Sequence, residues 1–394
     1  MHMYLAMEKE LLVARRQSGT WERETHLSGM QTTCLAIDPF RPERVYCGTL
    51  GRGLWYSDDG GHSWKPGGDA ATMMEPWKGD GIAHGRITAV AVSPTEQAHG
   101  YGVVYVGTEP TALFRSEDGG DAWQELNTLR ELPSAPTWSF PPRPYTSHAR
   151  WITADPLVPG RIFVAIEAGA LVRSLDGGVH WEDRTPDGPF DTHTLVMHPL
   201  APDRLYSAAG DGYPMPGRGY NESLDGGQTW QRPDEGLEHQ YLWSVAVDPA
   251  DPDTILVSAS SGPFIAHYTT PPSSERPTWD AGNRGRRPAW ANTGTPEQVP
   301  PQVNAQERAH QYSALYRKSQ GTTWQLVTAG LPEPQGMVVP VVASHRTEPG
   351  VFYALSNKGL YRSPDAGQSW EDAGIAWKPE YTRQRAQALV VSDL

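Results

Sequence analysis

The 394-residue sequence has little cysteine, no long hydrophobic run and no excess of positive charge. Two cysteines cannot form the framework of bridges that holds many small secreted proteins together. No stretch approaches the roughly 18 apolar residues of a membrane-spanning helix, so no membrane association is expected. Lysine and arginine number 33 against 46 aspartates and glutamates, and the resulting net charge of −13 disfavours nucleic acid as a partner.

Recognisable short signals are also missing. The N-terminus, MHMYLAMEKELLVARR, lacks the basic start and apolar stretch of a secretory signal, so a cytoplasmic protein is expected. The metal-binding patterns HExxH and CxxC do not occur. No short motif therefore supports a metal site.

Glycine, proline and tryptophan are abundant, with 40, 36 and 15 residues. Proline interrupts helices and glycine weakens them, so long helices are not expected. Hydrophobic residues still make up 38% of the chain and aromatic residues 10%, enough to bury a large core. This composition excludes an intrinsically disordered chain.

Much of the tryptophan belongs to a repeat. Five segments share the frame S-x-D-x-G-x-x-W and end at Trp64, Trp123, Trp181, Trp230 and Trp370. Two weaker copies end at Trp21 and Trp324. Glycine allows a positive φ, and serine and aspartate side chains can bind nearby backbone N–H groups, so each copy indicates a tight hairpin. We therefore assign the repeat residues to the scaffold and not to chemistry.

The repeat resembles the Asp-box, or BNR, repeat of sialidases, sortilin-type receptors, xyloglucanases and photosystem II assembly propellers. Each copy supplies four strands, for example 87–94, 103–109, 112–118 and 122–126. The residues before the first box tryptophan and after the last together make about one further repeat. The sequence thus predicts an all-β fold, a single seven-bladed β-propeller over residues 1–394, in which N-terminal strands pair with a C-terminal strand to close the ring.

Extra length is concentrated in the loops at one end of the predicted propeller. The longest are 65–83, 124–147, 210–222 and 261–313, whereas the turns at the other end are short. Long loops on one rim of a rigid scaffold commonly carry a functional site. The 261–313 segment is either a lid over the channel or a surface loop through which a homo-oligomer forms.

Four histidines precede or begin the predicted innermost strands of consecutive blades. Counted back from the proline that ends each strand, their offsets are all even, so the four side chains are expected to face the central channel. Converging neutral imidazoles are suited to a divalent transition metal, namely Zn, Mn, Fe or Cu. Alternatively, each makes separate hydrogen bonds at a polar channel mouth. The candidate ligands are His84, His148, His193 and His239.

Carboxylates are expected at the same end. Glu109 and Glu167 each lie seven residues before a box serine, in adjacent blades, so they are candidates for general acid and base or for metal ligands. The alternative is that they pair with Arg86 or Arg150. Asp211, on the next loop, is a further candidate catalytic residue.

The remaining candidates position or bind a substrate. Asp191, two residues before His193, could orient the imidazole ring. Arg150 could hold an anionic substrate through two parallel hydrogen bonds. The other candidate substrate-binding residues are Arg86, Tyr213, Tyr241 and His267.

Three classes of function fit these features. The leading prediction is a metal-dependent lyase or hydrolase that acts on a small polar or anionic molecule in the channel. The resemblance implies a second class, the glycoside hydrolases, but sialidases have six blades and an Arg-Ile-Pro motif that FPPRP (140–144) does not match. Xyloglucanases place their acids between two propellers, and only one is predicted here. The third class is a non-catalytic binding or assembly propeller.

Overall fold

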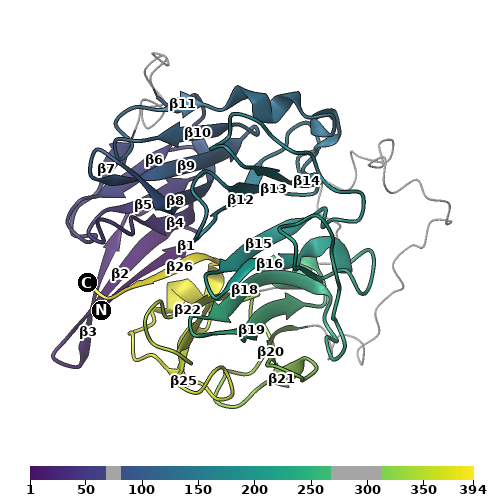
Figure 1. The fold of residues 1–394 in the computed structure, drawn as a ribbon. Coiled ribbons are helices and arrows are strands. Elements are labelled where there is room, and N and C mark those ends of the chain that lie inside the picture. Colours follow the sequence, from purple (N-terminus) through teal and green to yellow (C-terminus); the bar gives the residue numbers. More distant parts are fainter. Residues whose placement is uncertain (68–80, 268–311) are drawn as a thin grey trace.

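The computed structural model describes residues 1–67, 81–267 and 312–394. Within these residues the strands form seven antiparallel sheets that stand around a common axis (Figure 1). The predicted all-β, seven-bladed propeller is therefore confirmed.

The first four blades are built from strands of the N-terminal half, and blade 1 also contains the C-terminal strand β26. In sheet order they are β26 (Ala386–Ser392), β1 (His2–Met7), β2 (Glu10–Gln17) and β3 (Thr20–His26) in blade 1; β4 (Thr32–Ile37), β5 (Val45–Thr49), β6 (Leu54–Ser57) and β7 (Lys65–Gly67) in blade 2; β8 (Arg86–Ala98), β9 (Tyr101–Glu109), β10 (Leu113–Ser116) and β11 (Gln124–Glu125) in blade 3; and β12 (Ala149–Ala154), β13 (Ile162–Ile166) and β14 (Ala170–Ser174) in blade 4.

The other three blades follow in chain order. They are β15 (Thr192–His198), β16 (Ala201–Ala209) and β17 (Tyr220–Ser223) in blade 5; β18 (Tyr241–Asp248), β19 (Asp251–Ser260), β20 (Ser313–Lys318) and β21 (Gln325–Val327) in blade 6; and β22 (Val341–Ser344), β23 (Phe352–Ser356), β24 (Gly359–Ser363) and β25 (Glu371–Asp372) in blade 7. The described helices are short: α1 (Pro263–His267) and the 3₁₀ turns η2 (Asn127–Glu131), η3 (Ala135–Thr137), η4 (Gly210–Gly212) and η6 (Pro379–Arg383).

Blades 4 and 5 depart from the predicted four strands. Their fourth strand is reduced to one bridge each, Arg173 to Glu182 and Glu222 to Gln231. Pro186 and Pro233 follow closely, and proline supplies no backbone donor for a longer ladder.

The innermost strands form a closed ring. Each blade's first strand contacts the first strand of the next blade, and β22 contacts β26, which in turn contacts β4. Residues of all seven inner strands line a central channel of about 300 Å³. The inner edge of each sheet therefore faces the narrow channel and is protected from the outer surface.

The Asp-box residues act as the sequence predicts. In the first strong copy, Ser57 Oγ accepts the N–H of Gly61 at 2.8 Å and Asp59 Oδ1 accepts that of Ser63 at 2.9 Å. Gly61 has a φ of 88°, which other residues rarely adopt. The same serine-to-glycine bond recurs in the other four strong copies. These residues hold the hairpins together.

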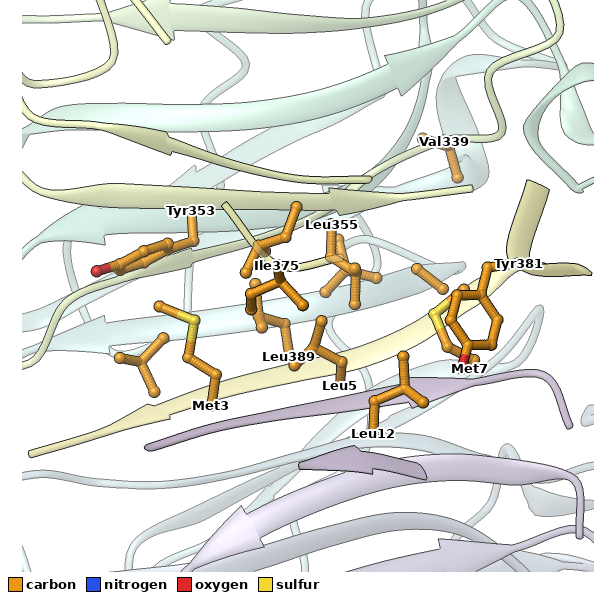
Figure 2. Close-up of a cluster of buried hydrophobic side chains, with 14 of the residues drawn as sticks. Met3, Leu5, Met7, Leu12, Val339, Tyr353, Leu355, Ile375, Tyr381 and Leu389 are labelled. Atoms are coloured by element: carbon orange, nitrogen blue, oxygen red, sulfur yellow. The ribbon is translucent and has the colours of Figure 1, made fainter. Parts of the chain in front are cut away.

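The chain ends close the propeller. Strand β26 pairs antiparallel with β1, and Leu5 lies opposite Leu389. Figure 2 shows side chains of β1, β2 and β26 packed against Tyr353 and Leu355 of blade 7. The buried cluster joins the first and last blades and confirms the predicted closure.

Part of the predicted loop region lies outside the described residues. Residues 268–311 include most of the 261–313 segment, so its predicted roles as a lid or an oligomer contact stay predictions. In the described ranges the one α-helix has five residues, and no helix there is long and apolar enough to cross a membrane.

The closure cluster gives a stability prediction. Leu5 is fully buried in it, so Leu5→Ala should lower the free energy of unfolding by about 2–5 kcal/mol. Leu175→Ala is the control, because Leu175 is 54% exposed and should change it by less than about 0.5 kcal/mol. Denaturant unfolding of both variants measures the difference. Equal losses would show that closure does not depend on this core.

Candidate functional site

A large pocket opens at the end of the channel where the long loops gather. Its volume is about 1280 Å³, and parts of blades 2 to 6, the connecting loops and the start of β26 line it. Most of the predicted site residues are among its lining: Glu109, His148, Arg150, Glu167, Asp211, Tyr213, Tyr241 and His267.

A shared irregularity of the inner strands shapes the pocket floor. In six blades the pairing between the first and second strands skips one residue near the start of the first strand, which is a β-bulge. The skipped residues are Thr33, Thr88, Arg150, His193, Trp243 and Gln387. A bulge re-aims a side chain, and here it does so at equivalent positions around the axis.

Three of these bulge residues bind the neighbouring blade. Thr33 Oγ1 donates to the carbonyl of Ile87 at 2.6 Å, and Thr88 Oγ1 donates to that of Ala149 at 2.6 Å. His193 Nδ1 donates to the carbonyl of Leu242 at 2.6 Å. Each accepting residue directly precedes the next blade's bulge, so these bonds tie the blades together.

Two carboxylates and an imidazole meet beside this ring. Oxygens of Glu167 and Asp191 and Nε2 of His193 all lie within 4.8 Å of one another. His193 is fully buried, and its Nε2 lies 3.7 Å from Asp191 Oδ2 and has no hydrogen-bond partner among the described residues. Since Nδ1 donates to a carbonyl, Nε2 carries the lone pair. This is the one cluster with metal-ligating geometry in the described part of the chain.

The two carboxyl groups have opposite electrostatic environments. Burial disfavours the charge of Glu167, but His148, whose Nε2 lies 2.8 Å from Oε2, and Arg150 lower the pKa of Glu167 below its usual value. Burial, followed by the charge of Glu167, raises the pKa of Asp191 well above its usual value. Burial and the repulsion between the two carboxyl groups therefore favour a proton on Asp191 and a negative charge on Glu167.

Asp211 supports the pair from the next loop. Its Oδ2 accepts the backbone N–H of Phe190 at 2.8 Å and that of Asp191 at 3.2 Å. Burial, and then the nearby Asp191, raise the pKa of Asp211 to about 6. Asp211 therefore fixes the backbone that carries Asp191.

Glu109 is neutralised by arginines. Arg143 Nε donates to its Oε1 at 2.7 Å, and Arg86 Nη1 donates to the same oxygen at 3.0 Å. Burial opposes ionisation, but Arg143 and the other cations lower the pKa of Glu109. Glu109 therefore pairs with arginines, which is the alternative to a catalytic role. Its partner Arg86 is not among the residues that line the pocket.

Aromatic side chains also line the pocket. The His193 ring lies 5.0 Å from that of Tyr241 and 4.6 Å from that of Trp243. Tyr241 Oη bonds to His267 Nε2 at 3.0 Å, and burial lowers the pKa of His267 to about 3. Tyr213, at the rim, is 53% exposed.

The expectation that four imidazoles converge needs correction. His239 Nδ1 bonds to Tyr316 Oη at 2.5 Å and packs against Tyr312, and of the four histidines only His148 lines the pocket. His84 lies edge-on to Phe114. The even offsets from the strand-ending proline do not predict a common face, because the bulge reverses the alternation of side chains. In addition, His84 and His239 lie before their strands begin.

Sequence reasoning gave one residue too small a role. Asp191 was expected only to orient His193, yet it lies in the pocket and forms a close pair with Glu167. Trp243 and Arg143 were not selected as site residues. Trp243, Arg150 and His193 occupy equivalent positions in their blades because each lies at the bulge. No local sequence signal marks that bulge.

The repeat type agrees with known proteins. Residues 55–66, around the box that ends at Trp64, match the family model of the BNR/Asp-box repeat. The chain is similar to the xyloglucanase Xgh74A of Acetivibrio thermocellus, with 24% identity over 74% of this chain and 41% of that protein. It therefore spans less than half the length of this relative.

Solved propellers have a similar fold. The GH74 enzyme of Niastella koreensis has a TM-score of 0.58 at 14% identity, over 94% of this chain and 54% of that one. YCF48 from Cyanidioschyzon merolae has a TM-score of 0.52 at 12% identity, over 88% of this chain and 86% of that one. At these identities the likeness concerns the fold alone.

Asp211 gives a prediction for the pH dependence of stability. Its pKa rises from 3.8 to about 6 on folding, so the folded state holds the proton more tightly and loses stability as pH rises through this interval. Asp211→Asn lacks that loss, and its stability relative to wild type should increase by about 3 kcal/mol between pH 4 and 8. Denaturant unfolding at several pH values measures this difference. The exposed control Asp121→Asn should give a flat difference, and a flat difference for Asp211→Asn would refute the assigned burial.

Proposed function

We propose that this protein is a glycoside hydrolase whose catalytic carboxyl groups are those of Asp191 and Glu167. The observation that carries this proposal is the close pair of carboxyl groups on the pocket wall, one placed to hold a proton and one to stay ionised. Hydrolysis of a glycosidic bond uses two such groups in these opposite states. Similarity to a xyloglucanase supports this function over the metal-dependent enzyme that the sequence favours.

Each carboxyl group has a defined role in this proposal. Asp191 protonates the oxygen of the leaving sugar while the Glu167 carboxylate attacks the anomeric carbon, which gives a covalent glycosyl-enzyme. Asp191 then takes a proton from water as that water releases the sugar. Carboxyl groups this close together are typical of retaining enzymes, so the product is expected to keep the anomeric configuration.

The surroundings fit these roles. His148 holds Glu167 at 2.8 Å, and Ala168 N–H binds Asp191 Oδ1 at 2.8 Å, which leaves Oδ2 for proton transfer. Tyr213, which is 53% exposed at the rim, offers a flat apolar face for a sugar ring, and Tyr241 and Trp243 complete the aromatic lining of the pocket. A pocket of about 1280 Å³ has room for more than one sugar unit. Tyr213 and His267 would contact the substrate at its rim and base.

The catalytic pair is tested by isosteric replacement. Asp191→Asn and Glu167→Gln should each lower kcat by about 10²–10⁴-fold on whichever oligosaccharide of a xyloglucan, glucan and uronan panel the wild type cleaves. Product release measured by chromatography gives the rates, and proton NMR of the first product gives its configuration.

Asp121→Asn, at an exposed site outside the pocket, is the matched control and should keep full activity. Retained activity in both pocket variants, or no cleavage of any panel member by the wild type, would contradict the proposed hydrolase.

A second candidate function is the predicted metal-dependent enzyme, favoured by the unpartnered Nε2 of His193. A neutral imidazole with two carboxylates is a donor set that suits Zn, Mn or Fe. The second nitrogen of the ring is already fixed by Leu242, as is typical of metal-binding histidines. Glu167, Asp191 and His193 would hold the ion, in place of the four histidines expected from the sequence.

Metal content separates the two functions. For the glycoside hydrolase, protein purified without chelator or affinity tag should contain well under one equivalent of transition metal, and EDTA should leave the activity unchanged. For the metal-dependent enzyme, elemental analysis should find one equivalent that His193→Ala removes. A His239→Ala control should not alter the metal content, because His239 lies outside the cluster.

A further inference from the structure

Arg150 is the positively charged residue among those at the bulges, and among the residues that the structure describes it makes no hydrogen bond to the next blade. The equivalent Thr33, Thr88 and His193 each donate to the next blade. Arg150 makes no such bond: within the described residues its buried Nε has no hydrogen-bond partner, and its closest carboxylate oxygen, on Glu167, is 3.7 Å away. A guanidinium has five donors and is rarely left without acceptors in a protein interior.

The guanidinium is nevertheless held in place. Its central carbon lies 4.4 Å from the centroid of the Trp243 ring, and the side chain is 12% exposed. Stacking on an aromatic face fixes the plane of the group without using its donors. Glu167 already has its hydrogen bond from His148, so it does not satisfy Arg150.

The terminal donors of Arg150 are not used within the described residues. Its two terminal nitrogens are not among the buried atoms, have no partner in the described part of the chain, and belong to a residue that lines the pocket. Other pocket arginines are engaged: Arg143 binds Glu109, and Arg184 donates to the carbonyl of Gly169 at 2.6 Å. Arg150 is thus a preoriented cation beside Glu167 whose guanidinium N–H donors are available to a ligand.

We infer that Arg150 is a specificity residue that binds a carboxylate on the substrate, so that the sugar in the pocket is a uronic acid. A carboxylate matches the planar fork of a guanidinium through two parallel hydrogen bonds. Trp243, stacked on Arg150, sets the plane in which that pair forms. The consequence for hydrolysis rests on the proposed function, whereas the binding step does not.

Binding to a variant that cannot turn over tests the inference by itself. The background is Asp191→Asn, and the probes are trisaccharides that end in glucuronate or galacturonate, each compared with its methyl ester. The ester keeps the sugar but removes the charge. Isothermal titration should show at least one acid binding about 10- to 100-fold more tightly than its ester.

Substitution of Arg150 should remove that difference. Arg150→Met keeps the stem against Trp243 and should bind acid and ester equally, and Arg150→Lys should recover part of the preference because it keeps the charge without the fork. Arg218→Met, at a rim arginine bonded to Asp187, is the control and should keep the preference. Unchanged melting temperatures would show that all variants are folded.

Two results would overturn the inference. One is that no acid binds more tightly than its ester, and the other is that Arg150→Met keeps the full preference. Neither depends on whether the wild type hydrolyses a glycoside, so failure of this inference and failure of the proposed function are distinguishable.

Discussion

The extra residue in six of the inner strands is the constraint on which the candidate site depends. Inner strands crowd around the axis, and a bulge at one height turns one side chain per strand away from regular alternation. Where that side chain is threonine or His193, it bonds to the next blade and ties the ring together. Where it is Arg150 or Trp243, it remains available to the pocket. The same backbone feature therefore serves closure in some blades and a site in others.

Electrostatics then separates the roles of residues that look alike in sequence. Glu109 and Glu167 occupy equivalent positions, but arginines neutralise the first, while a histidine and a near neighbour carboxyl surround the second. Burial removes the water that would otherwise stabilise all these charges. The raised pKa of Asp191 is a consequence of this crowding, and within the described residues the buried Nε2 of His193 is left without a hydrogen-bond partner. Both proposed functions arise from this one cluster.

The fold was largely predictable because its signal is local and repeated. In five copies a serine, an aspartate and a glycine in one hairpin bond to each other whatever the rest of the chain does, and with two weaker copies they give the number of blades. Closure was predictable from the terminal segments, which have the alternation of strands. The missing fourth strands of blades 4 and 5 were not, because the loss of one short edge strand depends on the path of the loop that follows.

The site was predictable only in part. Its location followed from the one-sided loops, and Glu167, Arg150, His148 and Asp211 all line the pocket. The convergence of His84 and His239 failed, because a period of two holds only within a regular strand. The sequence by itself determined the repeat, the ring and the end of the channel where polar residues gather. Only the tertiary structure decided which of these polar residues meet. A bulge changes the direction of a side chain, and pairing between blades depends on contacts between residues far apart in the chain.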